Sequence, residues 1–136
     1  MTDSADDDPL KSLEIDRNQY DRKRMADALE GLVAIDNETG DPIVLDSFQE
    51  LDSRRQISAL LLAKRAAHAL GHVEESEVGM KSSEIAERTN VAGSTVRRYA
   101  SDKLSFISND NGIDGYYIPE TGIRQAVDFI TEVKDQ

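Results

Sequence analysis

Two adjacent arginines, Arg97 and Arg98, have side chains that could bind another molecule through hydrogen bonds. The planar guanidinium group can hold guanine O6 and N7, or a phosphate, through two parallel hydrogen bonds. Neighbours on a helix point about 100° apart, so one arginine can meet a base while the other grips a backbone. Directly before them, Gly93, Ser94 and Thr95 combine hydroxyl groups with the free N–H groups of a helix start, which favour phosphate. The sequence leaves open which arginine takes which role.

The stretch from Ser82 to Ser101 predicts two short helices that position these side chains. The first helix is expected to begin at Ser82 or Ser83, whose hydroxyl can accept a hydrogen bond from a backbone N–H. Asn90 then suits a left-handed exit from the helix, and Val91 can fill the corner that follows. The turn itself is predicted at Ala92 and Gly93.

The second helix is predicted to be capped by Ser94 or Thr95 and to turn three residues inward by helical spacing, namely Val96, Tyr99 and Ala100. The order Glu-Ile-Ala-Glu, a turn, then Ser-Thr-Val-Arg-Arg-Tyr resembles the helix-turn-helix family of DNA-binding motifs. The sequence departs from the family pattern at Thr89, where an aliphatic residue is usual, and at Asn90, where glycine is usual.

A hairpin is predicted after the second helix. Leu104 to Ser108 alternates like a half-buried strand, Asn109 to Gly112 is rich in turn formers, and Gly115 to Ile118 returns as a second strand. From Ser53 to Pro119 the chain therefore resembles the winged helix family. The expected fold class is mainly α with small β, a winged helix-turn-helix preceded by an N-terminal helix and a β-hairpin.

The resemblance implies that the helix from Ser94 to Lys103 enters the major groove of DNA. The residues that it nominates for DNA binding are Lys81, Ser83, Gly93, Ser94, Thr95, Arg97, Arg98, Ser101 and Lys103. For Lys81 and Lys103, a solvated lysine is the alternative interpretation. The tip of the wing carries Asp110 and Asp114 and no Lys or Arg, so it is not expected to enter the minor groove.

The N-terminal third is predicted to hold a tail, a helix and a hairpin. Residues 1–17 are acidic and of low complexity, and they are expected to be disordered. Residues 18–50 predict a helix from Asn18 to Glu30 that ends at Gly31, followed by a hairpin of Leu32–Ile35 with Ile43–Leu45. The hairpin either packs on the core or supplies an edge for another subunit.

Arg22-Lys23-Arg24 lies on that first helix and permits two interpretations. It is either a basic arm that touches phosphate or a solvated face balanced by Asp21 and Asp27.

Residues 51–136 are assigned to the winged helix domain. Its central helix is predicted from Ser53, in a capping box with Gln56, to Gly71. Two histidines four residues apart, His68 and His72, precede Glu74, Glu75 and Glu77. They either form a metal site with these glutamates or are separated by the end of the helix at Gly71. No metal ligand is assigned. A last helix is predicted from Thr121 or Gly122, with Ile123, Ala126, Val127 and Ile130 on one apolar face. This face either mediates a homodimer or packs on its own domain.

The net charge of −11 is unusual for a nucleic-acid binder, but it is unevenly distributed. Residues 1–50 carry 5 basic and 14 acidic side chains, residues 51–100 carry 8 and 6, and residues 101–136 carry 3 and 7. Asp outnumbers Glu and Arg outnumbers Lys, so the composition resembles that of proteins from a salt-adapted, haloarchaeal-like cytoplasm. In molar salt the Debye length is about 3 Å, and the acidic surface would scarcely repel DNA.

Other features of the composition narrow the function classes. The chain has no cysteine, which excludes disulfides and thiolate chemistry, and no apolar run long enough to span a membrane. We expect a cytoplasmic protein without a leader segment. The sequence shows no phosphate loop and no nucleophile beside a base, so it gives no sign of an enzyme, and no cofactor is expected.

The leading hypothesis is a sequence-specific double-stranded DNA-binding protein, most simply a transcriptional regulator that works as a dimer on a two-part site. The alternative is a winged helix used as a protein–protein interaction module in transcription, replication or segregation machinery, with the hairpin or the last helix as the contact surface. Exposure of Arg97 and Arg98 would favour DNA, whereas burial or ion pairing would favour the interaction module.

Overall fold

The computed structural model of this 136-residue chain describes residues 8–14, 16–109 and 112–134. The fold is mainly helical with one small two-stranded antiparallel sheet. Its elements are η2 (Pro9–Leu13), α1 (Arg17–Leu29), β1 (Val33–Ile35), β2 (Pro42–Val44), η3 (Asp46–Glu50), α2 (Ser53–Ala69), η4 (Glu75–Glu77), α3 (Ser82–Thr89), α4 (Gly93–Asp102), η5 (Glu120–Gly122) and α5 (Ile123–Lys134).

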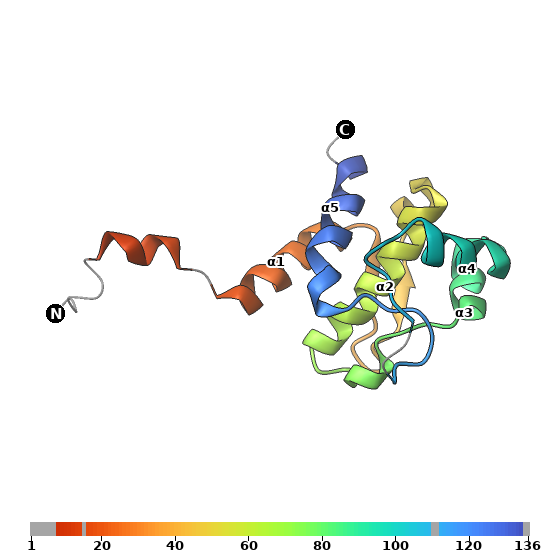
Figure 1. Ribbon diagram of the computed structural model, residues 1–136, viewed down its shortest axis with the longest axis horizontal. Coiled ribbons are helices and arrows are strands. Elements are labelled where there is room, and N and C mark those ends of the chain that lie inside the picture. The colour runs from red at the N-terminus through yellow and green to blue at the C-terminus, as the bar shows by residue number, and fades with distance from the viewer. Residues whose placement is uncertain (1–7, 15, 110–111, 135–136) are drawn as a thin grey trace.

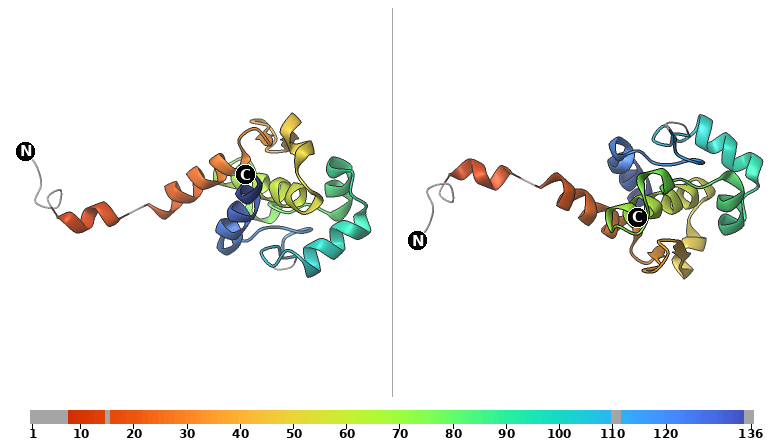
Figure 2. Two further views of the ribbon diagram at one scale, coloured as in Figure 1. Left: turned by 90° about the horizontal axis from the view of Figure 1, so that it is seen from above. Right: turned by 90° about the horizontal axis from the view of Figure 1, so that it is seen from below.

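Helix α2 is the centre of the fold. It is buried along most of its circumference, as expected for a helix that is apolar on nearly all sides. Helices α1, α3 and α5 and the β1–β2 hairpin all pack on it (Figure 1). The two further views in Figure 2 place α1 and α4 at opposite ends of the body. One continuous hydrophobic core results, which extends from Met25 in α1 to Ile130 in α5.

The start of α2 differs from the predicted capping box. Asp52, one residue earlier, is the N-cap, and its carboxylate accepts a hydrogen bond from the backbone N–H of Arg55. The side chain of Gln56 is buried and donates to the backbone carbonyl of Phe48 instead of reaching back to the cap. The prediction that Ser53 caps the helix is therefore wrong, because an aspartate was available at the preceding position. The predicted end is correct, since Gly71 follows α2 with φ of 86°.

The predicted N-terminal helix and hairpin are both present. Asp16 caps α1, and Gly31 follows its end with φ of 81°. In the hairpin Val33 pairs with Val44 and Ala34 with Ile43. The hairpin packs against α2, so the structure places it on the core. Of the tail predicted to be disordered, residues 1–7 lie outside the described residues, and Pro9–Leu13 forms a short exposed 3-10 helix.

The apolar face of α5 is buried against α1 and α2. Ile123, Ala126, Val127 and Ile130 all belong to the core. Arg55 of α2 fastens the helix further, because its Nε donates to the carbonyl of Phe129 at 2.8 Å. Of the two interpretations of the last helix, packing on its own domain is the one observed, and this face is not free to form a dimer.

The wing predicted at residues 104–118 is reduced to two isolated bridges. Ser108 pairs with Tyr117, and Met80 pairs with Tyr116 on the other side. The predicted strands are not formed because Leu104, Phe106 and Ile107 turn into the core without continuous pairing. The bridge at Met80 depends on Gly115, which has φ of 90° and leaves no room for a Cβ beside the Met80 backbone. Asp110 and part of the predicted turn lie outside the described residues.

Candidate nucleic-acid interface

The turn between α3 and α4 has the conformation that the sequence predicts. Asn90 is left-handed, with φ of 60°, and the buried Val91 fills the corner. Thr89 replaces the usual aliphatic residue without leaving a polar group unpaired. Its hydroxyl donates to the carbonyl of Ile85 at 2.9 Å and accepts from the N–H of Val91 at 3.2 Å. The threonine therefore ties the end of α3 to the turn and orients the helix that follows.

The capping of both helices differs from the prediction. At the start of α3 the backbone N–H of Lys81 donates to the Glu84 carboxylate at 3.0 Å, and no serine hydroxyl caps the helix. Helix α4 begins at Gly93, with Ala92 as N-cap, so Gly93 belongs to the helix and not to the turn. The N–H of Thr95 donates to the carbonyl of Ala92 at 3.0 Å and is not free for phosphate. The predicted phosphate site at the helix start is therefore limited to Gly93, Ser94 and the hydroxyl groups.

Arg97 and Arg98 both lie exposed on the outer face of α4, while Val96 and Ala100 are buried on its inner face. Arg97 Nη1 donates to the Ser82 hydroxyl at 3.3 Å, which links α4 to the first residue of α3. The Arg98 guanidinium lies 5.2 Å from the centre of the Tyr99 ring. Among the described residues neither arginine forms an ion pair, so both charges remain available to a ligand.

Arg54 is a candidate that the sequence interpretation missed. It is exposed in the first turn of α2, and its guanidinium lies 5.6 Å from the centre of the Tyr99 ring. The half-buried Tyr99 therefore has an arginine from α2 and an arginine from α4 close to its ring. The helical pattern placed Tyr99 on the inner face but gave no sign of which part of α2 lay beside it, because that contact is between residues 45 positions apart.

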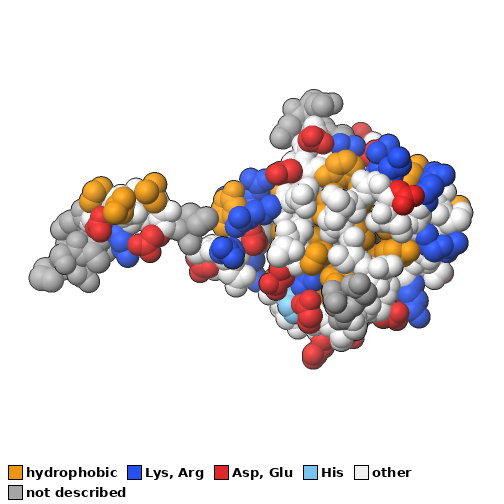
Figure 3. Space-filling model, viewed as in Figure 1, with side chains coloured by type: hydrophobic (Ala, Val, Ile, Leu, Met, Phe, Trp, Pro, Cys, Tyr) orange, Lys and Arg blue, Asp and Glu red, His pale blue; other side chains and the backbone are white. Residues whose placement is uncertain are grey.

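The other predicted residues surround this arginine pair. Ser83, Ser94, Ser101 and Lys103 are exposed, and Thr95 is half-buried. Lys81 is also exposed, but its ammonium group lies 3.5 Å from the Asp114 carboxylate, which offsets its charge. Lys and Arg side chains gather along the right-hand edge of the molecule, where α3 and α4 lie (Figure 3).

The basic stretch on α1 is committed to contacts within the protein. Arg22 donates to the carbonyl of Ala69 at the end of α2 at 2.7 Å, and Arg24 pairs with Asp128 of α5 at 2.6 Å. Lys23 lies 3.6 Å from Asp27 on the same helix. These contacts favour the interpretation as a charge-balanced helix face over the phosphate-binding arm.

The histidine and glutamate cluster also has a structural explanation. Arg65 is buried in α2 and makes two hydrogen bonds to the Glu75 carboxylate, at 2.8 and 3.3 Å, while His68 lies 3.6 Å from the same group. The hydrogen bond from Arg65 lowers the pKa of Glu75 below its ordinary value of 4.5; partial burial opposes this, and the charges of Arg65 and His68 add to it. In the part of the chain that the structure describes, no group of three or more His, Asp or Glu side chains could hold a metal ion.

Comparison with known proteins identifies no relative, since no family model, no curated protein and no solved structure matches the chain. Within the described residues no helix has the length and apolar character that crossing a membrane requires.

Proposed function

We propose that this protein is a winged helix protein that binds double-stranded DNA sequence-specifically, most simply as a transcriptional regulator, and that α4 enters the major groove. The observation that carries the proposal is the exposure of Arg97 and Arg98 on α4, with no ion pair to either among the described residues. Two exposed guanidinium groups that form no ion pair, on a helix at the edge of a molecule, are suited to binding base edges and phosphates.

The surroundings of the two arginines support different roles for them. Arg98 and Arg54 both lie near the Tyr99 ring, and each guanidinium offers several donors of the kind that a phosphate accepts. Arg97 is oriented by the Ser82 hydroxyl, a weak contact that a base edge can replace. In this proposal Arg97 reads guanine, and Arg98 with Arg54 grips the backbone.

The order of elements supports the winged helix assignment. Helices α2, α3 and α4 are followed by a returning segment that bridges back to Met80, between α2 and α3. The wing sequence, residues 104–118, contains no Lys or Arg and therefore offers no positive side chain to DNA, and its Asp114 pairs with Lys81. We therefore place recognition in α4 and assign the wing to closing the core.

The acidic composition supports a working environment of high salt. Ordinary phosphate neutralisation loses about 0.9 log units of affinity per contact for each tenfold rise in salt, so affinity in molar salt must rest largely on base contacts and shape. The proposal therefore includes a shallow dependence of binding on salt. A steep loss of affinity well below molar salt would contradict this part.

The experiment is a selection of fragments from a mixed genomic library in molar KCl, followed by fluorescence anisotropy on the selected duplexes and on a random duplex. The test variant is Arg97→Ala/Arg98→Ala. Its matched control is Arg17→Ala/Arg124→Ala, which removes the same charge from α1 and α5 at the other side of the body. We expect the control to select and bind the same fragments as wild type, and the test variant to bind selected and random duplexes equally weakly.

One observation favours a second candidate, the protein–protein interaction module. Asp114 neutralises Lys81 at the edge of the proposed interface, and an acidic wing suits a basic protein surface better than it suits DNA. If neither wild type nor the control variant selects any fragment at any salt concentration, this second function replaces the first.

A further inference from the structure

The most exposed large apolar side chains of the described residues lie on the short N-terminal helix η2. Leu10 is 65% exposed and Leu13 is 75% exposed, and the helix has no buried residue. Side chains three apart on a 3-10 helix lie one above the other, so the two leucines form a single apolar ridge. We call Pro9–Leu13 the arm. Figures 1 and 2 show it extended away from the body in every view.

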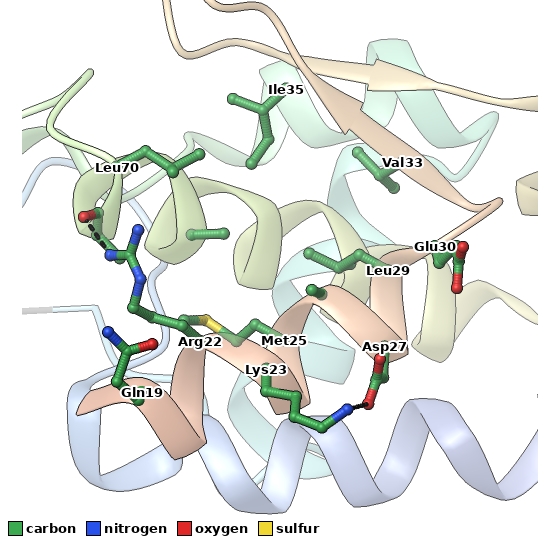
Figure 4. Close-up of a pocket in the computed structure, with 13 residues that line it drawn as sticks. Gln19, Arg22, Lys23, Met25, Asp27, Leu29, Glu30, Val33, Ile35 and Leu70 are labelled. Atoms are coloured by element: carbon green, nitrogen blue, oxygen red, sulfur yellow. Dashed lines mark hydrogen bonds and ion pairs between the residues drawn. The ribbon is translucent and has the colours of Figure 1, made fainter. Parts of the chain in front are cut away.

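A largely apolar pocket lies on the surface of the body. It has a volume of about 670 Å³ and lies between α1, β1 and the end of α2. Leu29, Val33, Ile35 and Leu70 point into it (Figure 4). Leu70, at the edge of the pocket, is 51% exposed, although leucine side chains are usually buried in the core. We call this the α1–β1 pocket.

We propose that the arm of one copy of this chain fills the α1–β1 pocket of a second copy, and that the two copies exchange arms in a symmetric dimer. Both surfaces belong to the same chain: the two leucines of the arm are exposed, and the lining of the pocket is largely apolar. Exchange of an identical element between two protomers is a common route to a twofold dimer, since each contact is made twice.

The direction of the arm favours a second copy over the chain's own pocket. Figures 1 and 2 show the arm beyond the N-terminal end of α1, on the side away from the body. The α1–β1 pocket lies in the other direction, along α1 beyond Gln19.

Charges do not decide this pairing. Glu14 lies 3.0 Å from Lys11 of the arm, and Lys23 on the rim of the pocket lies 3.6 Å from Asp27, which also lines it. In high salt these charges contribute little, and apolar burial carries the association. The dimer is therefore expected to persist in molar KCl. The inference does not depend on DNA binding, although a twofold dimer would suit a two-part site.

The first test is sedimentation of the full chain over a dilution series in molar KCl. Leu10→Asp/Leu13→Asp alters the arm, and Leu70→Asp alters the pocket. Ile43→Asp is the control, because Ile43 is 46% exposed, close to the 51% of Leu70, but does not line the pocket. We expect wild type and the control to dimerise, and each of the other variants to weaken the dimer on the order of 100-fold or more. Mixing the arm variant with the pocket variant should restore a dimer held by one intact arm and one intact pocket.

The second test separates exchange from folding back, and it does not depend on variants that weaken the fold. The chain has no cysteine, so Ser12→Cys/Ala26→Cys places the only two thiols on the arm, beside Leu13, and on the pocket lining, and it keeps both leucines. Treatment with a short bismaleimide is expected to give covalent dimers on a denaturing gel. Cross-linked monomers would overturn the proposal in favour of the chain's own pocket, and a wild-type chain that stays monomeric at every concentration would overturn it as well.

Discussion

Replacing Arg65 with methionine should lower the free energy of unfolding by about 2 to 3 kcal/mol, since methionine keeps the buried stem and removes only the guanidinium. The Arg65 side chain is 3% exposed. Its Nε donates to the carbonyl of Ile118 at 2.9 Å, and its two terminal nitrogens donate to Glu75. The substitution therefore cuts the link between α2 and the segment that returns from the wing.

Two unequal losses make up this magnitude. The carbonyl of Ile118, a fully buried residue, loses a charged donor, which costs about 1 to 3 kcal/mol. Glu75 is 55% exposed, so it returns to water, and the loss of its pairing costs at most about 1 kcal/mol. For a domain of this size the sum corresponds to a fall of about 10 °C in the melting temperature.

Urea unfolding followed by circular dichroism measures the effect, with Glu75→Gln as the control. That variant keeps the bond to Ile118 and an amide oxygen that can accept from Arg65, but it removes the counter-charge of a buried guanidinium, so it should cost about 1 kcal/mol. Equal losses in the two variants would refute the reasoning, because the ion pair and not the buried carbonyl would then hold the segment in place.

Three further predictions concern parts of the fold that position the interface. Because the pKa of Glu75 is lowered in the folded protein, the carboxylate contributes to stability above pH 4.5, and this contribution is lost as the pH falls through the pKa of the folded state. The urea midpoint of wild type should therefore fall more than that of Glu75→Gln between about pH 6 and pH 3. Gly115→Ala should cost about 3 kcal/mol in thermal unfolding, because the new Cβ meets the backbone of Met80. Gly112→Ala, in open space with φ of 80°, should cost about 1 kcal/mol. Equal losses would exclude the close approach of Gly115 to the Met80 backbone as the cause. Asp52→Ala should cost about 1 kcal/mol and Ser53→Ala much less, and the reverse order would restore serine as the cap of α2.

The local pattern was enough to predict most of the helical elements. Apolar spacing and a terminal glycine located α1 and α2, and Asn90 marked the left-handed turn between α3 and α4. These features depend on neighbouring residues, which the sequence displays directly. The helix starts were less accurate: the cap of α2 is Asp52, one residue before the predicted Ser53, and the N-cap of α4 is Ala92, two residues before Ser94, with no side-chain cap.

The features that could not be predicted depend on contacts between distant residues. Leu104 to Ser108 alternates like a strand, yet a strand needs a partner, and here the returning segment pairs chiefly at Tyr116 and Tyr117. A buried arginine at position 65 has no signature in the sequence, since its partners are a carboxylate 10 positions away and a carbonyl 53 positions away. The contact between Arg54 and Tyr99 is of the same kind.

The claim that α4 faces DNA is tested most directly by affinity cleavage from introduced cysteines, since the natural chain has none. A cleaving iron chelate is attached at Ser101→Cys, on the exposed face of α4, or at Gln125→Cys, on the exposed face of α5, and the selected duplex is mapped in molar KCl. We predict cuts confined to a few nucleotides of the site from position 101 and none from position 125. Cleavage from position 125 with none from position 101 would contradict the account, because a different face of the protein would then bind DNA.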